Sequence, residues 1–180
     1  MFIAVVFRPS WYVPSSLNHQ LRSPYALSLF GSGATVKLPV ARARELLVST
    51  SHGVLSTVHE SARPHSVPVV YAIDGDHVAV PIDDVKAKST SDLQRVKNLT
   101  AEPRACLLIE HWDREDWSTL WWVRADLELD ASAGERQQSD LSTSLRHTFP
   151  QYRDATFHSL LVFRIVGVTG WAAGDTNDIG

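Results

Sequence analysis

The sequence has little of several features that define common classes of protein. It contains a single cysteine, so it can form neither an internal disulfide nor a paired-cysteine metal site. This residue, Cys106, lies in an apolar run and is interpreted as a buried core side chain rather than a reactive thiol. No apolar stretch approaches the roughly 20 residues that a transmembrane helix needs. We therefore expect a cytoplasmic protein with no membrane partner.

Positive charge and recognisable catalytic motifs are also scarce. The formal net charge is -3, whereas general nucleic-acid binders gather basic residues to neutralise phosphates, so we expect no nucleic-acid partner. The histidines form no HxH or HxxxH pair, which leaves no basis for a metal site. The sequence contains no GxSxG elbow, Walker loop or GxGxxG fingerprint. No acid–base pair stands out, and no catalytic residue is assigned.

Acidic residues are absent from the beginning of the chain. The first is Glu45, and five basic residues precede it. Residues 1–35 show neither helical nor strand periodicity, so we expect an irregular extension there. An organelle transit peptide has this composition, and so does a sequence read from a start codon upstream of the true one. We favour the second hypothesis, with translation beginning near Val36 and a single domain over residues 36–175.

Regular hydrophobic patterns begin at Leu38. They predict a short helix that starts near Pro39 and ends before Gly53, and two further helices over about 92–100 and 135–147. Strands are predicted over residues 54–59, 65–73, 77–82, 104–111, 120–129 and 159–168. Asp74 and Gly75 predict a tight antiparallel hairpin between the second and third strands. The pattern indicates a mainly β protein, an antiparallel barrel with small helices.

The segment between the third strand and the second helix is suited to an anionic ligand. If it is extended, Lys86 and Lys88 point to the same side, because side chains alternate along a strand. Ser89 and the two hydroxyl residues after it add donors, and the N–H groups of the following helix add partial positive charge. This set suits a phosphate. A solvated loop with a serine or threonine helix cap explains the same residues equally well.

A proline interrupts the second predicted strand. Pro68 has no N–H for a ladder, and such prolines are usually confined to an edge, a bulge or a gap in a sheet. A ligand in such a gap could contact the backbone of Val67, Pro68 and Val69, with Ser56 and Thr57 on the preceding strand as neighbours. The alternative, which spacing alone slightly favours, is an edge strand blunted against aggregation.

Two adjacent tryptophans point to an interface. Trp121 and Trp122 must project to opposite faces of their strand, so one barrel interior cannot hold both. Trp112 and Trp117 flank an acidic loop just before them. Large exposed aromatic side chains mark interfaces, and the outward face needs a cover. We expect a second copy of the chain to supply it in a homodimer, and coverage by the chain's own helix is the alternative.

The order and spacing of these segments resemble the pyridoxamine 5'-phosphate oxidase-like split-barrel superfamily. The segments are GVLSTV at 53–58, RPHSVPVV at 63–70, KAK at 86–88, NL at 98–99 and PR at 103–104. Within it, the stretches DWSTLWWVRAD and VKAKSTSDLQRVKNL resemble the actinobacterial branch regarded as dependent on coenzyme F420. The similarity spans about residues 38–173.

The resemblance implies a six-stranded antiparallel Greek-key split β-barrel that forms a dimer, with the cofactor in a cleft between protomers. By position, Lys86 and Lys88 would hold the cofactor phosphate, with Ser89 beside them. Residues 67–69 would flank the ring system, and residues 56–57 would line the site. The superfamily commonly has a proline between two basic residues in this loop, where this chain has alanine.

The function that the resemblance implies is F420-dependent oxidoreduction, a hydride transfer between the deazaflavin and an unidentified small organic substrate. The cofactor carries the hydride chemistry itself, which agrees with the lack of an acid–base pair. FMN is the alternative cofactor, because it also ends in a phosphate and would use the same lysines, as in an FMN-dependent oxidase or reductase. A non-catalytic flavin- or haem-binding protein is an alternative of a different class, since a fold alone does not fix function.

Overall fold

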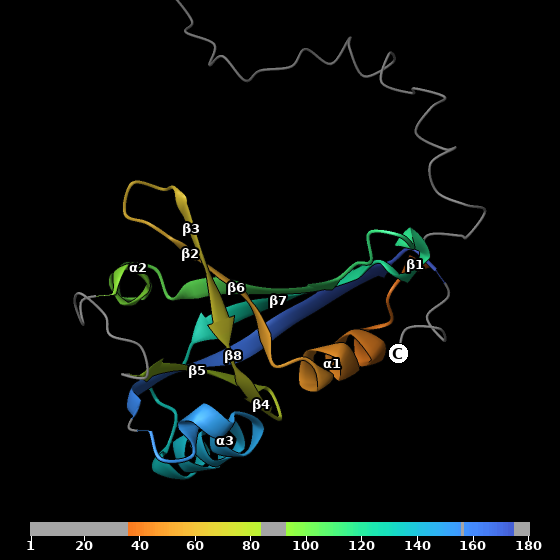
Figure 1. The fold of residues 1–180 in the computed structure, drawn as a ribbon. Helices are drawn as coiled ribbons and strands as arrows, with labels where there is room; N and C mark the ends of the chain where they lie inside the picture. The colour runs from red at the N-terminus through yellow and green to blue at the C-terminus, as the bar shows by residue number, and fades with distance from the viewer. Residues whose placement is uncertain (1–35, 84–92, 156, 175–180) are drawn as a thin grey trace, which may run out of the picture. The chain divides into compact units, whose positions relative to one another are not determined.

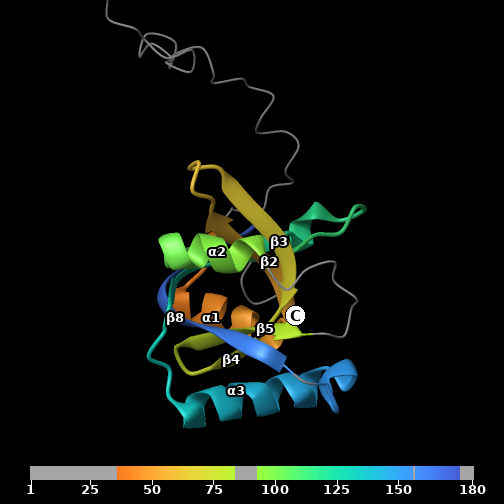
Figure 2. The same ribbon diagram turned by 90° about the vertical axis from the view of Figure 1, so that its left-hand side faces the viewer.

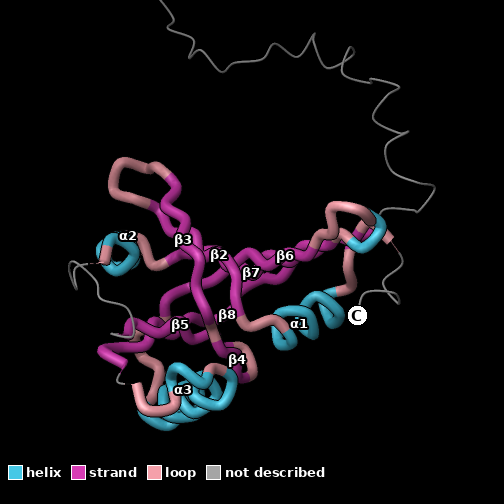
Figure 3. Tube along the Cα trace, viewed as in Figure 1, coloured by secondary structure: helices cyan, strands magenta, loops and turns pink. Residues whose placement is uncertain are grey.

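A computed structural model describes residues 36–83, 93–155 and 157–174. This part of the chain contains eight strands and three α-helices (Figures 1 and 3). The strands are β1 (Val36–Lys37), β2 (His52–Val58), β3 (Pro64–Val70), β4 (Ala72–Asp74), β5 (His77–Asp83), β6 (Arg104–His111), β7 (Trp121–Leu129) and β8 (Phe157–Ala172). The helices are α1 (Val40–Ser49), α2 (Gln94–Ala101) and α3 (Glu135–Thr148), with short 3-10 turns at Trp117–Thr119 and Pro150–Tyr152. The three predicted helices are confirmed.

The strands form one curled antiparallel sheet in the order β3-β2-β6-β7-β8-β5-β4, and β1 pairs with the end of β8. The predicted mainly β, antiparallel architecture is confirmed, and the curled half-barrel is consistent with a split barrel. The predicted count of six strands is wrong, because the path of the sheet contains seven. The run at residues 65–73, predicted as one strand, is divided between β3 and β4.

The division falls at Tyr71, where the chain passes from one end of the sheet to the other. β3 pairs with β2, whereas β4 pairs with β5 at the opposite end of the path. Tyr71 is only 2% exposed, its hydroxyl donates to the carbonyl of Leu47 at 2.8 Å, and its N–H donates to the carbonyl of Ser51 at 3.1 Å. Burial raises the pKa of the phenol above its usual range. These two bonds fix the corner to the end of α1 and the start of β2.

The hairpin predicted at Asp74 and Gly75 is confirmed. Asp74 lies opposite His77, so the turn between β4 and β5 consists of Gly75 and Asp76. Gly75 has a φ of 57°, which a glycine adopts without the steric cost that a side chain adds. The hairpin orients β5 for its long pairing with β8.

The main core fills the inner side of the curled sheet. Inward-facing side chains alternate with outward-facing ones along the strands, as the period of two predicts. Buried residues of this core include Leu55, Val78, Leu107, Ile109, Val123 and Phe163 from the sheet, Leu46 and Leu47 from α1, and Leu99 from α2. Both short helices therefore bury their apolar sides in the barrel.

A second, smaller cluster lies on the outer side of the sheet, where α3 packs along β4 and β5 (Figure 2). Leu141 and Leu145 of α3 pack with Ala79 and Val162 of the sheet. Among the described helices, none has the length and apolar character that crossing a bilayer requires. Residues of α1 and α2 thus pack in the main core, and residues of α3 pack in the outer cluster.

The corner bond of Tyr71 is expected to contribute measurably to stability. Tyr71→Phe removes the hydroxyl and leaves the buried carbonyl of Leu47 without its donor. We expect the free energy of unfolding to fall by about 1–3 kcal/mol, the cost of an unsatisfied buried polar group. Urea unfolding followed by tryptophan fluorescence measures this change, and an unchanged free energy would show that the hydroxyl does not hold the corner.

Asp130 is expected to make the free energy of unfolding depend on pH. Its carboxylate accepts from the hydroxyl and N–H of Ser132 at 2.6 and 2.9 Å and lies 3.3 Å from Nε2 of His77. The hydrogen bonds from Ser132, followed by the contact with His77, lower the pKa of Asp130. Stability from a carboxyl with a lowered folded pKa is present above its unfolded pKa and is lost as the pH falls through the folded pKa.

Asp130→Asn should therefore be less stable than the wild type at pH 7, and the difference should shrink as the pH falls from about 5 to 3. Urea midpoints across that range measure it. Asp140→Asn, which removes an exposed carboxylate on α3, serves as the control. A difference that stays constant across the range would contradict the assignment.

Candidate functional site

The predicted site residues fall into two groups. Ser56 and Thr57 lie on β2, and Val67, Pro68 and Val69 lie on the neighbouring strand β3. Lys86, Lys88 and Ser89 lie outside the described residues, so the phosphate-binding loop stays a prediction. The described part of the candidate site is therefore the β2–β3 hairpin together with α2, which packs on β2.

Pro68 lies in an edge strand, as one of its two interpretations predicts. Among the described strands, β3 is the last of the path and pairs with β2 alone. Two backbone bonds show which opposed residue pairs of β2 and β3 are hydrogen-bonded. The N–H of Tyr71 donates to the carbonyl of Ser51, and the N–H of His59 donates to the carbonyl of Arg63. The nitrogen of Pro68 therefore faces away from β2, and its missing N–H costs no ladder bond.

The same alternation of hydrogen-bonded and non-hydrogen-bonded pairs identifies which backbone groups of β3 are available to a ligand. Val67 and Val69 lie opposite Leu55 and Gly53 in the hydrogen-bonded positions, so their backbone groups face β2. Residues 66 and 68 alternate with them, and their carbonyls point to the free edge. The proline thus blunts the edge, and it does not free the backbone of Val67 and Val69 as the sequence hypothesis required.

The site residues also divide between the two faces of the sheet. Thr57 is buried on the inner face, and Val67 and Val69 are half-buried on the same face, opposite Leu55 and Gly53. Ser56 and Pro68 lie on the outer face. Ser56 is opposite Ser66, and their hydroxyl oxygens are 2.8 Å apart. The predicted residues therefore meet at one sheet edge, with apolar side chains on one face and small polar groups on the other.

A buried polar link connects α2 to this hairpin. Nδ2 of Asn98 donates to the hydroxyl of Thr57 at 2.9 Å, and Nε2 of Gln94 donates to Oδ1 of Asn98 at the same distance. The hydroxyl of Thr57 in turn lies 3.4 Å from the carbonyl of His65, to which it donates. Asn98 was not among the predicted site residues. The sequence contained one signal for it: asparagine is a poor helix former, and Asn98 lies beside Leu99 on the apolar side of a predicted helix.

The outer face of β2, β6, β7 and the second half of β8 carries no helix in the described part of the chain (Figure 3). Trp121 is buried and Trp122 is half-buried on the outer face, so the prediction that they project to opposite faces is confirmed. Trp122 lies between Glu110 of β6 and Trp171 of β8. Leu108 and Val54 continue the face on β6 and β2, and Val54 is 37% exposed.

Cys106 differs from its interpretation as a core residue. It is half-buried on this outer face, opposite Ser56, because its neighbour Leu107 takes the inward position. Burial, followed by the nearby charge of Asp126, raises the pKa of its thiol. A raised pKa disfavours the reactive thiolate, which supports an unreactive cysteine.

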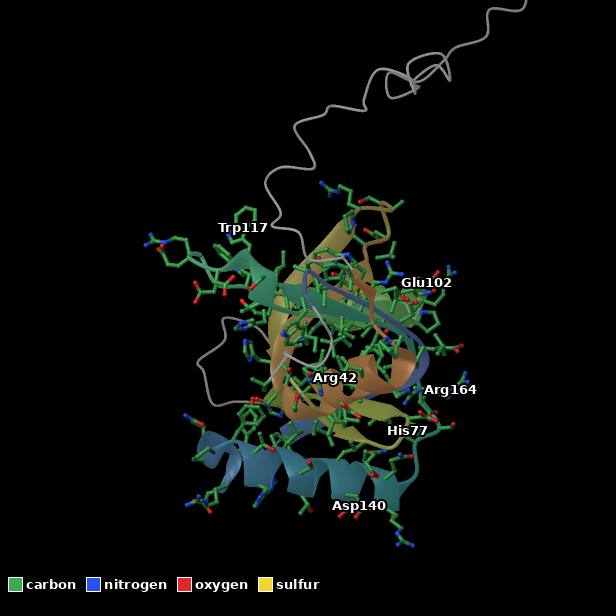
Figure 4. The ribbon with its side chains drawn as sticks, turned by 90° about the vertical axis from the view of Figure 1, so that its right-hand side faces the viewer. Arg42, His77, Glu102, Trp117, Asp140 and Arg164 are labelled. Carbon is green, nitrogen blue, oxygen red and sulfur yellow. The ribbon has the colours of Figure 1, made fainter. Side chains whose placement is uncertain are left out.

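Trp112 and Trp117 lie on the loop between β6 and β7 and are 52% and 51% exposed. Figure 4 shows the side chain of Trp117 projecting from this loop. The loop is shaped by its own carboxylates. Asp113 accepts from the N–H groups of the two residues that follow Arg114, and Asp116 accepts from the N–H and hydroxyl of Ser118. The acidic residues therefore order the loop that carries the two exposed tryptophans.

Two further observations on the described residues concern metal binding and cavities. Within residues 36–83, 93–155 and 157–174, no group of three or more histidine, cysteine or acidic side chains is arranged to hold a metal. A hollow of about 370 Å³ lies at the end of β7. It is lined by Glu128, Leu129, Asp130, Ala131, Ser132 and Arg164. None of the predicted site residues lies in it.

The comparisons with known proteins establish the fold. No protein-family model and no curated protein matches the chain. Among solved structures, 85 chains match. A haem-binding protein from Mycobacterium smegmatis has a TM-score of 0.59 at 19% identity, over 77% of this chain and 56% of its own length. The chain thus spans little more than half of that protein. It shares the fold of these proteins.

Two further solved structures share this fold. An FAD-binding protein from Mesorhizobium loti has a TM-score of 0.56 at 15% identity, with coverage of 76% of this chain and 96% of its own. An FMN-binding protein from Syntrophomonas wolfei has a TM-score of 0.54 at 21% identity, with coverage of 73% and 84%. The match supports the split-barrel resemblance at the level of the fold, and F420 stays a prediction.

The hydrogen bond between Asn98 and Thr57 is expected to stabilise the packing of α2 on the β2–β3 hairpin. Thr57→Val leaves the buried amide of Asn98 without its acceptor, which should lower the free energy of unfolding by about 1–3 kcal/mol. The double variant Thr57→Val/Asn98→Leu removes both partners and should cost less than the sum of the single changes. Thermal or urea unfolding measures the cycle, and strictly additive losses would show that the pair does not interact.

Proposed function

We propose that this protein binds a flavin-type cofactor at the free edge of β3 and acts as an F420-dependent oxidoreductase. The observation that supports this most directly is the edge itself. It offers outward-facing carbonyls at residues 66 and 68, apolar side chains at Val67 and Val69, and no competing N–H at Pro68. A flat heteroaromatic ring with an N–H on its polar edge fits such a combination.

The ends of the lysine segment support a phosphate site nearby. β5, which precedes the segment, contacts β3, and α2, which follows it, is bonded to Thr57 through Asn98. The elements on both sides of residues 84–92 therefore contact the candidate site. In the proposal, Lys86, Lys88 and Ser89 bind the cofactor phosphate, and the hairpin receives the ring.

When bound, the cofactor supplies the hydride chemistry. The chain's own contribution is to bind and orient it. Val67 and Val69 pack against the ring, the carbonyls at the edge accept from its N–H group, and the lysines hold the charged end. FMN satisfies the same contacts and is the alternative cofactor, which would make the protein an FMN-dependent oxidase or reductase.

A haem-binding, non-catalytic role is the second candidate. It is favoured by the fold shared with the haem-binding protein, at a TM-score of 0.59. Titration with haem distinguishes this candidate from the flavin proposals.

We further propose that the protein is a homodimer whose interface is the uncovered outer face of β2, β6 and β7. Arg124 and Asp126 lie 3.3 Å apart near its middle. Opposite charges side by side suit a two-fold interface, where the same patch meets itself in reverse. Trp122 and Leu108 supply the apolar part.

Light scattering tests the dimer. The wild type should have the mass of two chains, and Leu108→Glu should shift it toward one, because a buried charge at the interface is unpaired. Val48→Glu, on the exposed side of α1, is the matched control and should leave the mass unchanged. A wild type that is monomeric at all concentrations would overturn this part of the proposal.

Cofactor binding is tested by titrating the purified protein with F420, FMN and haem and following fluorescence and absorbance. We expect F420 to bind most tightly. Lys88→Ala should weaken its binding by about 1.5–3 kcal/mol, the scale of a hydrogen bond to a charged group, while Lys37→Ala on β1 serves as the control. Oxidation of reduced F420 by added acceptors then tests hydride transfer. Tighter binding of FMN or haem would favour the respective alternative, and no binding would refute the proposal.

A further inference from the structure

The hairpin contains a buried polar atom that the fold leaves unpaired. Nδ1 of His65, on β3, is buried and has no hydrogen-bond partner among the described residues. The other buried atoms of this kind belong to arginine side chains, none of which lies on β2 or β3. An unsatisfied buried polar atom destabilises the folded state, and such atoms are rare in folded proteins. The atom is therefore a sign of a missing partner.

The neighbours of His65 are already engaged with other groups. Thr57, directly opposite on β2, uses its hydroxyl hydrogen for the carbonyl of His65 and accepts from Asn98. Oδ1 of Asn98 accepts from Gln94. These bonds fix the backbone of His65, and its imidazole takes part in none of them.

The position of His65 relates it to the proposed ring site. It lies on the same face of β3 as Val67 and Val69, because side chains two residues apart share a face. Neighbours on that face are separated by about 6.6 Å along a strand. A ring packed against Val67 therefore has its rim within reach of an imidazole one step along the same edge strand.

We infer that His65 is a ligand-binding residue of this site, whose Nδ1 forms a hydrogen bond with the polar rim of the bound ring. The inference rests on the proposed function and adds a residue to it. The ligand class is a heteroaromatic ring with adjacent carbonyl and N–H groups, as in flavins and deazaflavins. A neutral imidazole suits either group, because its nitrogen donates or accepts according to the tautomer.

A binding role and a structural role make opposite predictions for the protein without cofactor. If His65 served only the fold, its replacement would destabilise the protein. If Nδ1 awaits a ligand, His65→Leu removes an unpaired buried nitrogen, and the urea midpoint of the cofactor-free protein stays the same or rises. His65→Asn keeps a polar atom close to the position of Nδ1.

The experiment measures the Kd of F420 and of FMN by fluorescence titration, together with the urea midpoint without cofactor. We expect His65→Leu to raise the Kd of whichever cofactor binds by at least tenfold at an undiminished midpoint, and His65→Asn to recover part of the loss. His147→Leu, an exposed position on α3, is the control and should leave the Kd unchanged.

Each outcome bears on a distinct claim. An unchanged Kd in His65→Leu, or a lowered midpoint of the cofactor-free protein, would overturn the role of His65 and leave the proposed function standing. A wild type that binds neither F420 nor FMN would instead overturn the proposed function, and the role of His65 with it.

Discussion

The passage of the chain through Tyr71 determines how the rest of the sheet is arranged. β3 and β4 are consecutive in sequence, yet they pair with strands at opposite ends of the sheet. The sheet must therefore curl until its ends come within one residue of each other. The buried hydroxyl of Tyr71, bonded to Leu47, holds that corner against α1. The inner core, the free edge of β3 and the contact between β3 and β5 all depend on this closure.

Much of the architecture could be predicted from the local pattern. The alternation of apolar residues located the strands, and helical spacing located α1, α2 and α3, because each element buries one side in a shared core. The break at Tyr71 could not be predicted in this way. Residues 69–73 form an unbroken run of apolar side chains, and only contacts with distant residues divide it. The misplacement of Cys106 has the same cause, since a continuous apolar run does not show which side chains face inward.

The candidate site was predictable only in part. That Pro68 lies at a sheet edge follows from its missing N–H. Which backbone groups of β3 face the free edge depends on the register with β2, and the local pattern does not give that register. The link from Asn98 to Thr57 joins residues 41 apart in sequence, a distance over which no spacing rule operates. The unpaired nitrogen of His65 likewise becomes visible only when the neighbours are in place.

The corner also has a consequence for the order in which the molecule can assemble as it is synthesised. Tyr71 reaches Leu47 across 24 residues, so this bond and the β2–β3 and β4–β5 hairpins can form while the chain is still short. β5 can pair with β8 only after β8, the last of the described strands, has left the ribosome. Until then, β5 exposes an unpaired apolar edge. The nascent chain therefore passes through a stage in which its corner is complete but its sheet is open, and that is when it most needs protection from aggregation.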